Sequence, residues 1–132
     1  MLQLKTYQQK ALDSLALYLQ ACDQTQDSDA AFYQTTRQIW EGRGIPYNPI
    51  LKPPELKDIP YVCLRLPTGG GKTLLACHAV SVANRDYLKR DHSLVLWLVP
   101  SNAILDQTLL ALQDNNHPYN QASSAHLARS RS

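Results

Sequence analysis

Apolar positions recur with a helical period in the first forty residues of the chain. Between residues 4 and 22 they fall every three or four positions, which is typical of the buried face of an amphipathic helix. A polar stretch follows, and a shorter helical pattern over residues 30–40 ends just before Gly42 and Gly44. Five prolines then lie between residues 45 and 60, where each removes a backbone donor and fixes a dihedral angle. The first half therefore predicts two helices and a long loop.

The pattern changes after Pro60. The short apolar run YVCLRL, residues 61–66, predicts a strand, and helical spacing begins directly after three glycines and continues to Leu88. The run SLVLWLV, residues 93–99, is apolar at nearly every position, which is typical of a strand buried on both faces. A last helical pattern covers residues 103–113. The order β-α-β-α predicts an α/β fold with a parallel, right-handed crossover.

Composition limits the class of protein without deciding its function. The 132 residues are 44% hydrophobic and 18% charged, which is typical of one soluble domain, and the formal charge of +2 is compatible with a nucleic-acid partner without requiring one. Three cysteines with no C-x-x-C spacing argue against a disulfide framework or a zinc site and favour a reducing cytoplasm. No apolar run approaches the roughly 18 residues of a membrane span. We expect a cytoplasmic protein with no membrane partner.

The stretch PTGGGKT, residues 67–73, has the chemistry of a phosphate-binding loop. Gly69, Gly70 and Gly71 can adopt backbone conformations that turn N–H groups toward an anion, and the positive end of the following helix dipole points to the same place. Lys72 would reach the β and γ phosphates, and the hydroxyl of Thr73 would bind Mg²⁺. The strict G-x-x-x-x-G-K-[ST] pattern is not met, because Leu66 stands at the position of its first glycine. A simple glycine turn between strand and helix is the alternative.

Four motifs together resemble the superfamily-2 helicases and translocases, and in particular the ATPase subunit of type III restriction enzymes. LPTGGGKT resembles motif I of that superfamily, LKTYQQKAL resembles its upstream glutamine motif, and WLVPSNAILDQT resembles motif Ia. NHPYNQA is similar to the segment that follows motif Ia in the restriction subunits. The resemblance implies a RecA-like P-loop NTPase fold, here with an incomplete parallel sheet and flanking helices. Residues 1–120 would then be the N-terminal part of the first ATPase lobe, and residues 121–132 a disordered tail.

The resemblance also implies ligands and partners. Gln8 would hydrogen-bond the adenine edge of ATP, and the stretch from Thr68 to Thr73 would hold the triphosphate with its Mg²⁺. Double-stranded DNA would be contacted through its backbone by Pro100, Ser101 and Asn102, and a DNA methyltransferase subunit is the expected protein partner. Purely structural roles stay open for these residues. Gln8 could be solvated on the polar face of its helix, and Ser101 or Asn102 is in any case a natural N-cap.

Hydrolysis needs an acidic residue at the end of a second strand, and Pro100 follows the apolar run at 93–99 instead. The acids Asp106 and Asp114 fall in or after the last predicted helix. The chain is therefore expected to be an N-terminal fragment that binds ATP and DNA but is inactive alone. Two other functions remain: part of a different superfamily-2 helicase or translocase, and a nucleotide-binding interaction module that does not turn over ATP.

Overall fold

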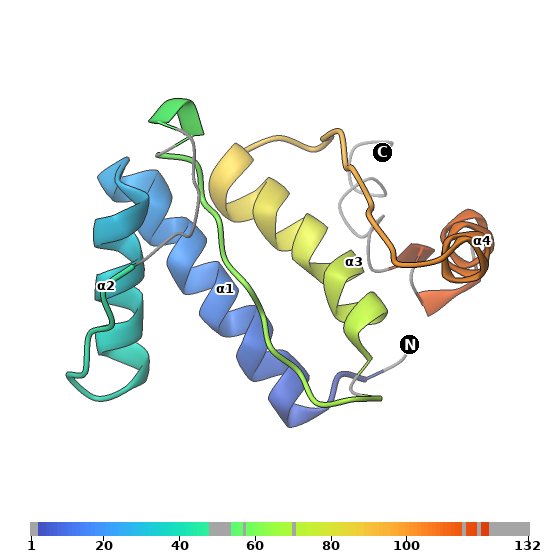
Figure 1. Ribbon diagram of the computed structural model, residues 1–132, viewed down its shortest axis with the longest axis horizontal. Helices are drawn as coiled ribbons and strands as arrows, with labels where there is room; N and C mark the ends of the chain where they lie inside the picture. The colour runs from blue at the N-terminus through green and yellow to red at the C-terminus, as the bar shows by residue number, and fades with distance from the viewer. Residues whose placement is uncertain are drawn as a thin grey trace, which may run out of the picture.

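The computed structural model describes residues 3–47, 54–56, 58–69, 71–114, 116–118 and 120–121. Four α-helices lie along these ranges, with a short 3₁₀ helix and a π-helix between them (Figure 1). Their bounds are α1 Thr6–Thr25, α2 Ser28–Ile39, η1 Pro54–Leu56, α3 Lys72–Ala83, η2 Asn84–Leu88 and α4 Asn102–Gln113. The helices predicted from the sequence are all present, and the first two begin two residues away from their predicted starts. No helix of the described part of the chain is both long and apolar enough to cross a membrane.

Helices α1 and α2 form a hairpin whose turn follows from local capping. Gln26 ends α1 in the left-handed conformation, at φ 56°, and Asp27 caps α2 by accepting hydrogen bonds from the N–H groups of Asp29 and Ala30 at 3.0 and 3.1 Å. Helix α3 lies on the other side of α1 (Figure 1). The apolar face of α1 is buried between them, in a core made of Leu12, Leu15, Tyr18, Leu19, Cys22, Ala31, Leu75 and Val82.

The prediction of an α/β fold with a parallel sheet is wrong: none of the described residues forms a β-strand. Residues 61–66 and 93–99 are extended but unpaired, and Figure 1 shows why, because they run on opposite sides of α3. Strands of one sheet must lie about 4.8 Å apart to share backbone hydrogen bonds. With a helix between the two segments, neither can supply the partner that the other needs. The sequence pattern predicted a strand at each of these two segments, and both predictions are wrong.

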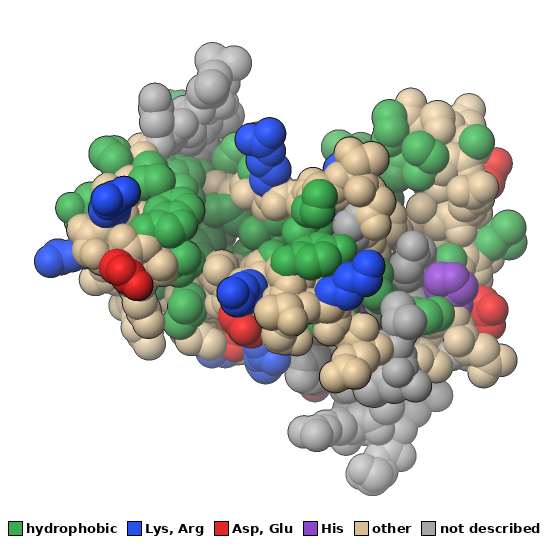
Figure 2. Space-filling view, turned by 90° about the horizontal axis from the view of Figure 1, so that it is seen from below, with side chains coloured by type: hydrophobic (Ala, Val, Ile, Leu, Met, Phe, Trp, Pro, Cys, Tyr) green, Lys and Arg blue, Asp and Glu red, His purple; other side chains and the backbone are tan. Residues whose placement is uncertain are grey.

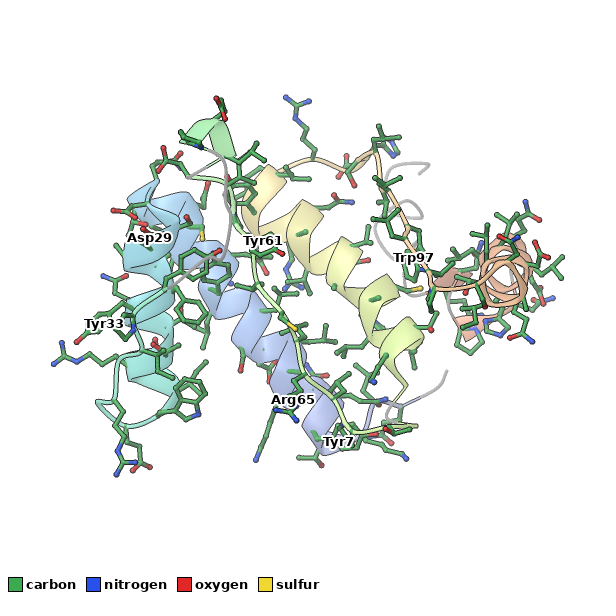
Figure 3. The ribbon with its side chains drawn as sticks, in the orientation of Figure 1. Tyr7, Asp29, Tyr33, Tyr61, Arg65 and Trp97 are labelled. Atoms are coloured by element: carbon green, nitrogen blue, oxygen red, sulfur yellow. The ribbon has the colours of Figure 1, made fainter. Side chains whose placement is uncertain are left out.

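Each extended segment is held against the helices by packing of some of its side chains. Val62 and Leu66 pack against the core beside α1, while Tyr61 remains 66% exposed. In the second segment Trp97 packs against Leu74 and Cys77 of α3 (Figure 3). Leu94, Leu96 and Leu98 point away from α3 and are 101%, 82% and 82% exposed. The second segment is thus held on one face and open on the other.

The far end of α3 is tied back to α1. After Ala83 the helix widens into η2, and Lys89, directly after η2, has its Nζ 3.8 Å from the carboxylate of Asp23 on α1. The tail predicted to be disordered lies outside the described residues, except for Gln121, whose N–H donates to the carbonyl of His117 at 3.2 Å. The tail prediction therefore stays a prediction.

Candidate nucleotide-binding site

The glycine loop meets the start of α3 in the geometry expected of an anion-binding turn. Gly69 and Gly71 both have positive φ, at 73° and 76°, a region that residues with a side chain rarely enter. Gly71 is the N-cap of α3, so the helix begins at Lys72 as the sequence predicted. Gly70 lies outside the described residues. The two described glycines therefore supply the backbone reversal that directs the chain into the first turn of α3.

The N-terminal end of α3 is left without a side-chain cap. The N–H groups in the first turn of a helix have no partner within the helix, and the N-cap of α3, Gly71, has no side chain that could cap them. Helices α2 and α4 differ, because Asp27 caps the first and Ser101 the second. The positive end of the α3 dipole lies at this glycine, which is favourable for a bound anion.

The polar side chains of the loop are accessible. Thr68, Gly69 and Lys72 are exposed, and Thr73 is partly exposed in the first turn of α3. Immediately inside them, Leu74 and Leu75 are 6% and 2% exposed and anchor the helix in the core. The site therefore has a charged, open side and a rigid, apolar base. A Lys ammonium, a Thr hydroxyl and the backbone N–H groups of a helix start are chemically suited to hold a phosphate group and its Mg²⁺.

Gln8 lies at the same end of the molecule, where α1 and α3 both begin (Figure 1). It is 5% exposed, so the interpretation of a solvated residue on a polar face is wrong. Its Oε1 accepts a hydrogen bond from the N–H of Lys5 at 2.9 Å. A Cβ placed on Gly71 would lie only 2.5 Å from its Nε2. The structure therefore brings the glutamine of the upstream motif directly against the glycine loop.

Lys5 is the one element of this arrangement that sequence reasoning missed. It is the N-cap of α1, and Gln8 stands three residues later, at the position from which a Gln side chain caps the preceding backbone N–H. That spacing is visible in the sequence and could have predicted the Lys5–Gln8 hydrogen bond. The labelled side chains Tyr7 and Arg65 lie at this same end, from α1 and from the first extended segment (Figure 3).

The predicted DNA-contacting residues lie elsewhere. Pro100, Ser101 and Asn102 are exposed at the start of α4, across α3 from the segment that leads into the glycine loop (Figure 1). Ser101 is the N-cap, and its Oγ accepts from the N–H of Ile104 at 3.4 Å, while Asn102 is the first residue of the helix. Capping thus accounts for Ser101, and the Asn102 side chain is exposed.

Other residues with reactive side chains do not assemble into a site. Cys77 is fully buried, and burial raises the pKa of its thiol to about 11. Burial also lowers the pKa of the neighbouring His78. No group of three His, Cys, Asp or Glu residues that could hold a metal ion occurs in the described ranges. Lys and Arg side chains are scattered among hydrophobic ones on the face seen in Figure 2.

Comparison with known proteins supports the resemblance inferred from the motifs. A search of curated proteins and a search of solved structures gave no match. The model of the family described as type III restriction enzyme, res subunit, matches residues 1–131, nearly the whole chain. The suspected resemblance is thereby confirmed, and the chain belongs to this family of helicase-like ATPases.

Proposed function

We propose that this chain is a nucleotide-binding module that holds MgATP in the loop from Thr68 to Thr73. The observation that carries the proposal is the start of α3: two glycines with positive φ lead into a helix whose N-cap, Gly71, has no side chain to cap it. Backbone N–H groups and the helix dipole together attract phosphate. Lys72 adds a full positive charge next to them.

The residues of the loop fit the nucleotide and its metal. Lys72 would bind the terminal phosphates by charge-assisted hydrogen bonds, and Thr73 would offer its hydroxyl to Mg²⁺. Bound Mg²⁺ would neutralise part of the triphosphate charge. Gln8 belongs to the same site through its contact with Gly71. Residues 1–120 would carry these groups, with the last residues of the chain outside the module.

Double-stranded DNA is the second ligand that we propose. A helix start with exposed Ser and Asn side chains is an ordinary site for a DNA phosphate, because hydroxyl, amide and backbone N–H groups all donate to phosphate oxygens. Pro100, Ser101 and Asn102 have this form and this exposure. Membership of the family favours DNA as the polyanion and a DNA methyltransferase subunit as the protein partner.

A substitution of Lys72 tests nucleotide binding. Lys72→Ala should weaken MgATP binding by about 1.5 to 3 kcal/mol, the range for hydrogen bonds to charged groups. Lys10→Ala is a matched control, because Lys10 is an exposed lysine on α1. Both variants and the parent chain would be titrated with a fluorescent ATP analogue. Equal affinities of the Lys72 variant and the parent would refute the assignment.

A second candidate is a nucleotide-binding interaction module that does not turn over ATP, and the exposed apolar side chains of α4 and of residues 94–98 favour it. The two candidates differ in turnover, which phosphate release with and without double-stranded DNA would measure. Release that DNA stimulates and that Lys72→Ala abolishes would exclude the second candidate. It would also show that an acid such as Asp106 completes the site.

A further inference from the structure

The contact between Gln8 and Gly71 joins two segments that are far apart in the chain. Gly71 has a φ of 76°, and a Cβ at this position would lie 2.5 Å from Gln8 Nε2 and 3.8 Å from Gln8 Cδ. Real Cβ atoms do not approach another heavy atom to 2.5 Å. Any other residue at position 71 would therefore force the amide of Gln8, the flexible end of its side chain, to shift.

Both ends of the Gln8 amide face the protein. Its Oε1 accepts from the N–H of Lys5 at 2.9 Å, and its Nε2 faces Gly71. With 5% of its surface exposed, the side chain is enclosed between the first turn of α1 and the glycine loop. Reading an adenine edge requires the same amide to present a donor and an acceptor to the base. The geometry here directs those groups toward the backbone instead.

We propose that Gln8 is a positioning residue that fixes Gly71, and with it the phosphate loop, rather than a reader of adenine. The inference rests on the proposed function for the binding of nucleotide, but its structural part does not. A glycine has access to more backbone conformations than any other residue, and the amide of Gln8 beside Gly71 limits them. Gln8 should then contribute to binding of the triphosphate, whichever base is attached.

Binding of three ligands separates the two roles. The parent chain, Gln8→Ala and Gln9→Ala would each be titrated calorimetrically with MgATP, MgGTP and magnesium tripolyphosphate. Gln9 is the matched control, an exposed neighbour whose Nε2 donates to Asp13 Oδ1 at 2.9 Å. Gln8→Ala should weaken all three ligands by the same factor, roughly tenfold, which corresponds to about 1.4 kcal/mol. Weaker binding of ATP with unchanged tripolyphosphate would overturn the proposal in favour of adenine recognition.

Failure of the proposed function gives a different result. If the parent chain and Lys72→Ala bind all three ligands equally, or none, the nucleotide site itself is wrong. The positioning role is still tested without nucleotide, by hydrogen exchange of the Leu75 amide, which donates to the carbonyl of Gly71 at 3.0 Å. Gln8→Ala should speed this exchange, while the Trp40 amide at the end of α2 keeps its rate. Unchanged exchange at Leu75 would refute the positioning role.

Two glycine variants keep the test valid if Gln8→Ala does not fold. Gly69→Ala and Gly71→Ala impose a similar φ strain, but an added Cβ meets nothing within 4 Å at Gly69. The Gly71 variant should therefore lower the midpoint of thermal unfolding more than the Gly69 variant, because only the former displaces Gln8. Equal losses would contradict the proposal, since the Gln8 contact would then add nothing.

Discussion

Two regions of the described chain differ in how completely they bury their apolar side chains: the helices α1, α2 and α3, and the segment from residue 92 to 113. Helices α1, α2 and α3 bury their apolar faces against one another, and Ala31 and Leu75 are 0% and 2% exposed in that core. The segment from residue 92 to 113 is also rich in apolar side chains but leaves most of them exposed, with Leu109 and Leu110 at 50% and 68% exposure on α4. Figure 2 shows hydrophobic side chains at the surface at the α4 end of the molecule.

The difference shows which hydrophobic patterns can be buried by contact with a single neighbouring element. An amphipathic helix needs only one neighbouring apolar face, and α1 finds two, in α2 and α3. A strand that is apolar on both faces needs a sheet, because its backbone groups require partners as well as its side chains. Trp97 packs against α3, but Leu94, Leu96 and Leu98 remain exposed.

The largest expected effect contrasts one leucine from each region. Leu75→Ala should lower the free energy of unfolding by about 2 to 5 kcal/mol, because it opens a cavity in the core where the side chain is 2% exposed. Leu110→Ala should change it by less than about 0.5 kcal/mol, since that side chain is 68% exposed. Urea unfolding followed by circular dichroism measures both. Similar losses would mean that α4 is packed as firmly as α3, which would break the comparison.

A smaller effect concerns the three thiols. Cys63 is exposed on the first extended segment, while Cys22 and Cys77 are 2% and 0% exposed. Burial also raises the pKa of Cys77 to about 11, so its reactive thiolate is rare at neutral pH. A disulfide reagent at pH 7.5 should therefore modify one thiol rapidly and the other two only on unfolding.

The variant Cys63→Ser is the control for that measurement. It should remove the rapid phase and leave the two slow thiols unchanged. A Cys63 that reacts as slowly as the buried pair would show that residues 61–66 are covered, as they would be in the centre of a sheet. The experiment therefore sharpens the contrast between covered helices and open extended segments.

The helices could be predicted from the sequence because their causes are local. The spacing of Leu12, Leu15 and Leu19 identifies the buried face of α1, and Ser101 identifies the start of α4. The sheet could not be predicted, because pairing depends on where the chain places residues 61–66 relative to 93–99, and α3 separates them. Alternating or continuous hydrophobicity specifies an extended segment but does not specify its partner.

The local geometry of the glycine loop was predictable to a similar extent. Three glycines before Lys72 indicated positive φ and a helix start, and both occur at the described positions. The role of Gln8 depends on the distance between its amide and Gly71. This distance cannot be inferred from the spacing of the two residues along the chain. Its burial resulted from the crossing of α1 past the start of α3. Local chemistry could be inferred from residue types, and long-range contact could not.

The smallest expected effect concerns the carboxylate of Asp86, in the region where η2 packs on α1. Asp86 is 6% exposed, and Arg85 Nη2 and Nε donate to its two oxygens at 2.7 and 3.0 Å. Hydrogen bonding from Arg85 lowers the pKa of Asp86, and a hydrogen bond with Gln20 of α1 acts in the same direction. The folded protein therefore binds a proton at Asp86 less readily than the unfolded chain does.

The sign of the pH dependence follows from this lowered pKa. The contribution of Asp86 to stability is complete above the pKa of an unfolded Asp, about 3.9, and is lost as the pH falls through the lower folded pKa. Asp86→Asn should thus reduce the free energy of unfolding at pH 7 and flatten its decline between pH 5 and pH 2. Asp91→Asn, at an exposed aspartate in the turn that leads into residues 92–113, should leave both unchanged. The Arg85 side chain is 53% exposed, so solvent screens the pair and keeps the effect below that of Leu75→Ala. If Asp91→Asn flattened the decline in the free energy of unfolding at low pH as much as Asp86→Asn does, charge would stabilise the region that leads into residues 92–113. The contrast between the two regions would then lie only in their apolar packing.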